Sequence, residues 1–187
     1  MHNDNPEYLT AAELEAGLGN INRSPAEEGL VEMIVRRPKV GEREVLEQGM
    51  LDAGEGLVGD SWKARGSAKT PDGSARPDLQ ITVMNAHAIA LVAGTKERWP
   101  LAGDQLYISM DISSGNLPPG TRLGVGEAIL EVSAEPHNGC KKFEARFGRD
   151  ALKFVNSDAG KALRLRGLNA RVVKPGEVRV GDVVKKL

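Results

Sequence analysis

Apolar and polar residues alternate over short stretches along much of this chain. Val31, Met33 and Val35 alternate with polar residues, which predicts a half-buried strand that ends at Arg36-Arg37-Pro38. Further strands are predicted at residues 43–47, 79–84 and 105–110. Short strands of this kind, joined by turns, favour a mainly β protein.

Two tight turns divide apolar runs in the later part of the chain. Gly126-Glu127 lies between two strand-like runs within residues 122–134, and Pro175-Gly176 lies between two more within residues 169–180. Each arrangement predicts a β-hairpin. A last short apolar run follows at Val183-Val184.

Helical patterns are fewer and short. Thr10, with Glu13 three residues later, has the spacing of a capping box ahead of a predicted helix at residues 11–16. Further helices are predicted over residues 86–93 after the N-cap Asn85, between residues 143 and 155, and after Ser157.

A long glycine-rich stretch interrupts these elements. Residues 50–66 contain four glycines, and polar residues continue the stretch to Asp78. Long loops inside compact domains are more often functional or mobile than idle. We therefore expect this loop to be functional or mobile.

The strands do not alternate regularly with long helices, which argues against a doubly wound parallel sheet. We predict a mainly β protein with peripheral helices (α+β) and a β-barrel-like or two-sheet core. Residues 1–29 are predicted to form an N-terminal extension with one short helix, and residues 30–187 the domain itself.

Composition narrows the functional classes. The 25 Lys and Arg residues nearly balance the 26 Asp and Glu residues, so a nucleic-acid partner is not expected. No apolar run approaches the roughly 18 residues of a membrane span, and the N-terminal residues lack the apolar core of a signal peptide. The single cysteine cannot form an intramolecular disulfide, and a free thiol fits a reducing compartment. We expect a cytoplasmic protein without membrane contacts.

Cys140 lies in the segment richest in candidate chemistry, between His137 and the pair Lys141-Lys142. The two lysines and the start of a predicted helix favour a thiolate. Three roles stay open on the residues alone. A lone cysteine is commonly a small buried hydrophobe, a Cys/His pair can act as a nucleophile, and a thiolate can bind a soft metal.

Basic residues flank this segment and the long loop. If they converge in the fold, they form an anion pocket suited to a phosphorylated ligand. Asp60, directly after Gly59, is expected to orient a basic side chain or to cap a turn. The candidate cations are Lys63, Arg65, Arg76, Lys141, Lys142, Arg146, Arg164 and Arg166.

Five motifs in a fixed order resemble the MOSC domain, the module found at the C-terminus of molybdenum cofactor sulfurases. They are Gly56-Leu57-Val58-Gly59-Asp60, Gln80-Ile81-Thr82, residues 120–128, Cys140-Lys141-Lys142-Phe143 and residues 176–182. The resemblance extends over residues 30–187. The chain is similar in length to the small stand-alone bacterial members of the family.

The resemblance implies a β-barrel-like fold with flanking helices and a molybdenum cofactor (molybdopterin) as ligand. It implies that Cys140 is a metal ligand of molybdenum or a persulfide carrier. Some relatives reduce N-hydroxylated compounds, so a reductase or a sulfur transferase is the implied enzyme, and a non-catalytic sulfur carrier is the alternative. The cofactor-binding candidates are His137, Lys141, Lys142, Asp60, Lys63 and Arg65.

The implied partners are a cysteine desulfurase or an external electron-transfer protein, together with a small-molecule ligand. A reductase would need the external donor because the sequence has no flavin, haem or iron–sulfur motif, and no pyridoxal-phosphate domain is recognised in it. Two positions depart from the family pattern. Ser61-Trp62 follows Gly59-Asp60 where relatives often have Arg-His, and Gly139-Cys140 replaces the common Pro-Cys step.

Overall fold

The computed structural model describes residues 8–187, which fold around a closed β-barrel. A sheet of eight strands closes on itself through pairing of its first and seventh strands, and β2 (Glu44–Leu46) extends it beyond the closure. The barrel strands, in order, are β11 (Val183–Lys186), β7 (Arg122–Val125), β8 (Ala128–Val132), β9 (Leu168–Lys174), β5 (Ile81–Asn85), β6 (Leu106–Ile108) and β1 (Glu28–Arg36). All neighbouring pairs are antiparallel except β5 and β6.

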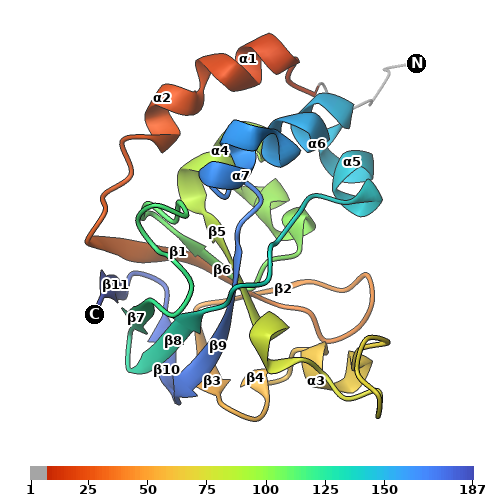
Figure 1. Cartoon of the computed structure of the whole chain (residues 1–187), viewed down its shortest axis with the longest axis vertical. Coiled ribbons are helices and arrows are strands. Elements are labelled where there is room, and N and C mark those ends of the chain that lie inside the picture. Colours follow the sequence, from red (N-terminus) through yellow and green to blue (C-terminus); the bar gives the residue numbers. More distant parts are fainter. Residues whose placement is uncertain (1–7) are drawn as a thin grey trace.

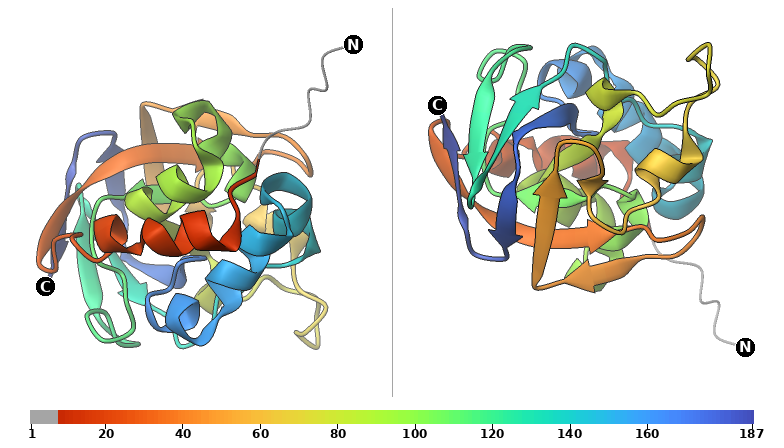
Figure 2. Two further views of the ribbon diagram at one scale, coloured as in Figure 1. Left: turned by 90° about the horizontal axis from the view of Figure 1, so that it is seen from above. Right: turned by 90° about the horizontal axis from the view of Figure 1, so that it is seen from below.

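A second, three-stranded sheet corrects two sequence predictions. It contains β10 (Gly176–Arg179), β3 (Gln48–Asp52) and β4 (Gly56–Leu57), and Figure 2 shows it beside the barrel in the view from below. The glycine-rich stretch 50–66 is therefore not a loop throughout. The predicted hairpin over 169–180 is also wrong, because β10 pairs with β3 and not with β9.

The cause of the second error lies at Gly176. A Cβ on this residue would lie 2.5 Å from the Glu127 carbonyl carbon, so the chain passes against the β7–β8 turn at this point. The backbone thus leaves the barrel at Pro175-Gly176 and enters the other sheet. A turn signal marks a change of direction, but it does not state which strand comes next in the sheet.

The helices lie mainly on one side of the barrel, and the small sheet lies on the other (Figure 1). They are α1 (Ala11–Ala16), α2 (Leu18–Ile21), α4 (Ala86–Ala93), α5 (Lys141–Phe147), α6 (Arg149–Asn156) and α7 (Asp158–Ala162), with α3 (Trp62–Arg65) near the small sheet and 3₁₀ helices at Pro77–Leu79 and Lys96–Ala102. Three predicted caps are confirmed at Thr10, Asn85 and Ser157, each of which accepts backbone N–H bonds.

A β-bulge divides the alternating residues of β1 between two cores. The register of β1 against β6 shifts between Val31 and Met33. Val31 consequently packs inside the barrel with Ile34, whereas Met33 and Val35 pack in the layer between barrel and helices. A bulge exchanges the two faces of a strand. Both faces of β1 are buried, one against the barrel interior and the other against the helical layer.

Gly148 ends α5 and separates it from α6. Its φ is +89°, and a Cβ there would lie 2.9 Å from the ring of Tyr8. Glycine adopts this backbone conformation without steric cost, unlike other residues. The predicted helical stretch between residues 143 and 155 is therefore two helices that meet at an angle, and α5 carries Cys140 at its start.

The prediction of a mainly β fold with a barrel-like core and peripheral helices is confirmed. Within residues 8–187, none of the helices is both long enough and apolar enough to cross a bilayer.

The N-terminal helix α1 packs on the domain through Leu14, which is completely buried against the helical layer. Replacing Leu14 with Ala is expected to lower the free energy of unfolding by about 2–4 kcal/mol, because a buried leucine leaves a cavity. Denaturant unfolding of Leu14→Ala and of the exposed control Glu15→Ala measures this. Equal effects of the two substitutions would show that α1 does not share the core.

Candidate functional site

Cys140 is the N-cap residue of α5, and its side chain is exposed. The residue before it is held in place by α6: the Gly139 N–H donates to Asn156 Oδ1 at 2.8 Å, and Asn156 Nδ2 donates to the Gly139 carbonyl at 3.0 Å. A Cβ on Gly139 would lie 2.8 Å from Leu152 Cδ1. This explains the departure from the Pro-Cys pattern, because proline has no N–H to donate and no room for its ring here.

The surroundings of the sulfur favour a thiolate. Partial burial raises the pKa of the Cys140 thiol, whereas hydrogen bonds from the backbone N–H groups of Phe143 and Lys142 lower it. The positive charges of Arg166 and Lys142 lower this pKa further, so the net shift is downward. A lowered thiol pKa together with exposure is the microenvironment of reactive cysteines and not of inert structural ones.

Cys140 opens into a cavity of about 490 Å³, which we name the Cys140 cavity. Seven cationic side chains line it, and none of its lining residues within the described chain is a carboxylate. The cations are Arg37, Lys39, Arg43, Arg65, Lys142, Arg146 and Arg166. Such an excess of positive charge around a concave surface creates a potential that attracts anions.

Four of these arginines are held by four successive backbone carbonyls at the end of the 3₁₀ helix Lys96–Ala102. Arg43 Nε donates to Pro100 O (3.2 Å), Arg146 Nη1 to Leu101 O (2.6 Å), Arg166 Nη2 to Ala102 O (3.0 Å) and Arg37 Nη1 to Gly103 O (2.9 Å). The last carbonyls of a helix carry partial negative charge, and most lack intrahelical partners, although the Pro100 carbonyl also accepts the Gly103 N–H at 3.1 Å. They therefore hold the guanidinium groups in place without neutralising them.

Arg43 and Arg146 meet above Gly103, which has a φ of +88°. A Cβ built on Gly103 would lie 3.3 Å from Arg43 Nη2 and 3.8 Å from Arg146 Nη1. Burial lowers the pKa of Arg43, and the nearby charges of Arg146 and Arg37 lower it further. Neighbouring like charges repel one another, and a bound anion would reduce that repulsion.

Arg37 and Asp60 form a buried bidentate ion pair behind the cavity wall. Arg37 Nε and Nη2 donate to the two carboxylate oxygens at 2.8 and 2.9 Å, and the Asp60 side chain is completely buried. Asp60 also accepts the Trp62 N–H at 2.9 Å. Asp60 therefore both orients a basic side chain and closes the turn that leads into α3, the two roles that its sequence position had left open.

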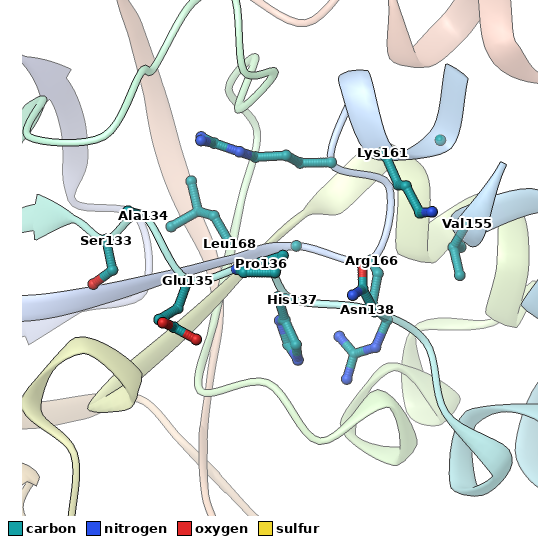
Figure 3. Close-up of a pocket in the computed structure, with 13 residues that line it drawn as sticks. Ser133, Ala134, Glu135, Pro136, His137, Asn138, Val155, Lys161, Arg166 and Leu168 are labelled. Carbon is teal, nitrogen blue, oxygen red and sulfur yellow. The ribbon is translucent and has the colours of Figure 1, made fainter. Parts of the chain in front are cut away.

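A second buried pair joins Arg166 to Asp104, with Nη1 to Oδ2 at 2.6 Å. The other Asp104 oxygen lies 3.4 Å from His137 Nδ1. His137 and Arg166 lie side by side in a second cavity of about 370 Å³, which Lys161 also lines (Figure 3). Burial and the charge of Arg166 lower the pKa of His137 to about 4, so this imidazole is neutral at pH 7.

The structure brings some of the predicted site residues together and separates others. Lys142 and Arg65 line the Cys140 cavity. Lys63 forms an ion pair with Glu55 on an exposed surface, and Lys141 is exposed outside the cavity lining. His137 lines the second cavity and not the Cys140 cavity. The structure therefore does not bring Cys140 and His137 together in one cavity as a nucleophile pair.

Two of the remaining candidate cations lie elsewhere. Arg76 forms ion pairs with Asp78 and Glu135 at 2.7 and 2.9 Å, and Arg164 lines the second cavity.

Sequence reasoning did not identify the contribution of the segment between β1 and β2. Arg37, Lys39 and Arg43 all line the Cys140 cavity and come from this segment. The basic residues that follow the first predicted strand are a signal in the sequence that this segment could take part in an anion site. The sequence gives no means of relating this segment to Cys140, which is about a hundred residues away.

The fold and the site define a class: a small β-barrel protein with an exposed cysteine in a cationic cavity. The chain belongs to the MOSC domain family, whose model matches residues 59–185, more than half of the chain. A search of curated proteins finds no match.

Solved structures share the fold. The YUAD protein from Bacillus subtilis is 18% identical, with a TM-score of 0.62 over 85% of this chain and 95% of that one. YiiM from Escherichia coli is 19% identical, with a TM-score of 0.54 over 84% and 69% of the two chains. YiiM from Geobacillus stearothermophilus is 15% identical, with a TM-score of 0.57 over 86% and 75%.

The low pKa of His137 predicts a pH-dependent stability. Between pH 6.5 and 4 the unfolded chain binds a proton at this residue that the folded chain does not, so the free energy of unfolding falls as the pH decreases. The contribution is roughly 3 kcal/mol over this range. Urea unfolding at successive pH values is expected to show a shallower acid decline for His137→Asn than for wild type. Parallel curves would contradict the assignment.

Proposed function

We propose that this protein binds the molybdenum cofactor in the Cys140 cavity, with Cys140 as the protein ligand of molybdenum. The observation that carries the proposal is an exposed thiol in one cavity with seven cations and no lining carboxylate among the described residues. Thiolates suit soft transition metals, and guanidinium groups suit phosphate oxygens. The cofactor presents both kinds of group, a metal and a phosphate.

The residues present fit this ligand. Arg43 and Arg146 converge above Gly103 and are the best placed to hold the phosphate, because neither forms an ion pair with a carboxylate in the described chain. Arg65 is partly buried, which lowers its pKa, as does the charge of Arg37. An additional anionic group would relieve both effects.

Within the described residues, no group of three or more His, Cys, Asp or Glu side chains is arranged as a metal site. A metal at Cys140 would thus bring most of its ligands with it, as the cofactor does. When bound, molybdenum would supply two-electron redox chemistry, and the activity that we propose from the family resemblance is reduction of N-hydroxylated compounds. Cys140 would hold the metal and the arginines would fix the phosphate. The electrons would come from an external electron-transfer protein.

The test is the molybdenum and pterin content of protein purified from a cofactor-producing host. Arg43→Ala combined with Arg146→Ala is expected to lose both, since each charged hydrogen bond to phosphate contributes about tenfold in affinity. Cys140→Ser is expected to lose molybdenum. Arg171→Ala, which removes an exposed arginine of β9 that pairs with Glu131, is the matched control and is expected to bind normally.

Wild-type protein without molybdenum would contradict the proposal. An equal molybdenum content in wild type and Cys140→Ser would also contradict it, because the metal would then bind without the thiol.

The exposure of Cys140 favours a second candidate, in which this residue carries sulfur as a persulfide. The Cys140 thiolate would attack the terminal sulfur of a persulfide on a cysteine desulfurase. The sulfur–sulfur bond of the donor breaks, a new one forms at Cys140, and the desulfurase cysteine leaves as a thiolate. The lowered pKa of Cys140 supports this step because the thiolate is the nucleophile.

Incubation with a cysteine desulfurase and free cysteine, followed by intact-mass spectrometry, tests the carrier function. A mass increase of one sulfur atom is expected in wild type and not in Cys140→Ser. Thiol–disulfide exchange needs access to the sulfur, and Cys140 is exposed. The transfer is therefore expected within minutes at neutral pH. The absence of an adduct in wild type, with an active desulfurase, would rule out this function.

A further inference from the structure

The second cavity, which His137 and Arg166 line, takes no part in the function proposed for Cys140. Its volume of about 370 Å³ lies at the lower end of the range for small-molecule sites. Cys140, Arg43 and Arg146 do not line it, and Arg166 is the one described residue that lines both cavities. The second cavity is therefore a separate candidate for binding a small ligand.

Buried polar atoms without a hydrogen-bond partner are concentrated at this cavity. Five such side-chain atoms occur in the described chain, and three of them belong to lining residues: Ser133 Oγ, His137 Nδ1 and Arg166 Nε. A fourth, Asp104 Oδ1, lies 3.4 Å from His137 Nδ1, and the Arg166 side chain is only 9% exposed. Buried polar groups are nearly always paired, so a cluster of unpaired ones indicates ordered water or a ligand.

Arg164, which also lines the second cavity, has an unusual backbone conformation. Its φ is +50°, and it is the one residue other than glycine with a positive φ in the described chain. Residues remain in this left-handed region only where their surroundings hold them there, and they cluster at binding sites. Arg164 Nη1 donates to the carbonyls of Leu117 and Ile112 at 2.7 and 3.4 Å. Backbone and side chain together therefore fix this guanidinium group.

The contacts of Nη1 leave the other edge of the Arg164 guanidinium free. Among residues 8–187, no group accepts a hydrogen bond from its Nε or Nη2. Arg37 and Arg171 use this same edge to bind the carboxylates of Asp60 and Glu131. The two N–H groups form a rigid fork that matches two oxygens of a carboxylate or a phosphate. The free edge of Arg164 is therefore a preformed part of an oxyanion site.

The charges of the lining residues also favour an anion. Lys161 is exposed and, like Arg164, forms no ion pair within the described chain. Arg166 is already paired with a buried aspartate, and Glu135, the one carboxylate of the described lining, is paired with Arg76 at 2.9 Å. Two cations therefore remain without a counter-charge. Burial lowers the pKa of Arg164, and a bound anion would counter that shift.

We propose that the second cavity binds a small molecule through an oxyanion group, a carboxylate or a phosphate, which the Nε–Nη2 edge of Arg164 and the Lys161 ammonium group hold. The unpaired polar atoms of Ser133 and His137 supply hydrogen bonds to an uncharged polar part of the same ligand, directly or through an ordered water molecule. This site is separate from the Cys140 cavity, so it does not depend on whether the molybdenum cofactor binds.

The experiment follows the Nε–H signals of the arginine side chains in proton–nitrogen NMR spectra while inorganic phosphate or succinate is added. The Arg164 signal is identified by backbone-linked assignment and by its absence in Arg164→Asn. Asparagine adopts the left-handed conformation more readily than most residues, so this variant is expected to fold. The Arg164 signal is expected to shift to saturation with either probe, and the probe that binds more tightly shows which oxyanion the site selects.

Lys161→Ala is expected to weaken the affinity reported by the Arg164 signal by about threefold to tenfold, because one charged hydrogen bond is lost. Lys161 is exposed, so this substitution does not disturb the core. Lys185→Ala, which removes an exposed lysine of β11 outside the cavity, is the matched control and is expected to bind as wild type does. Arg43→Ala combined with Arg146→Ala is also expected to leave the Arg164 response unchanged.

An Arg164 signal that shifts with neither probe at millimolar concentration would overturn the proposal. Equal affinities in Lys161→Ala and wild type would do the same. Loss of the Arg164 response in the variant without Arg43 and Arg146 would contradict a separate site, since those arginines line only the Cys140 cavity. The Arg164 response is measured in cofactor-free protein, so it distinguishes failure of this site from failure of cofactor binding at Cys140.

Discussion

The four carbonyls Pro100 to Gly103 are the constraint on which the Cys140 cavity depends. Each accepts a hydrogen bond from a different arginine, and these arginines come from three separate parts of the chain. A carbonyl satisfies a guanidinium donor without cancelling its charge. The end of one short 3₁₀ helix therefore gathers like charges that would otherwise repel one another, and it does so beside the only cysteine.

Two buried ion pairs divide these arginines into two kinds. Arg37 and Arg166 are each fixed by a completely buried aspartate, Asp60 and Asp104. Arg43 and Arg146 have no such partner among residues 8–187, so no described carboxylate neutralises them on the cavity side. The paired arginines shape the wall, and the unpaired ones are free to bind an anion. Removing one member of a buried pair costs more than the pair contributes, which makes this wall intolerant of change.

Local signals in the sequence predicted the elements well where the deciding contacts are themselves local. The helix at residues 86–93 begins at Asn85 and ends before Gly94 as expected, and the β7–β8 hairpin forms at Gly126-Glu127. The pairing of β10 with β3 could not be predicted, because it joins residues about 130 positions apart. The cavity shows the same limit. Cys140 and Lys142 were identified from their own segment, whereas Arg37 and Arg43 reach the site through long-range contacts with backbone carbonyls.

In the proposed function, the cysteine and the unpaired arginines serve one ligand, which carries a soft metal and a phosphate. The decisive measurement is a crystal structure of protein loaded with the cofactor, with data collected at the molybdenum absorption edge. We expect an anomalous peak within bonding distance of Cys140 Sγ and phosphate density between Arg43 and Arg146. A peak at another site, or a phosphate held away from both arginines, would contradict it.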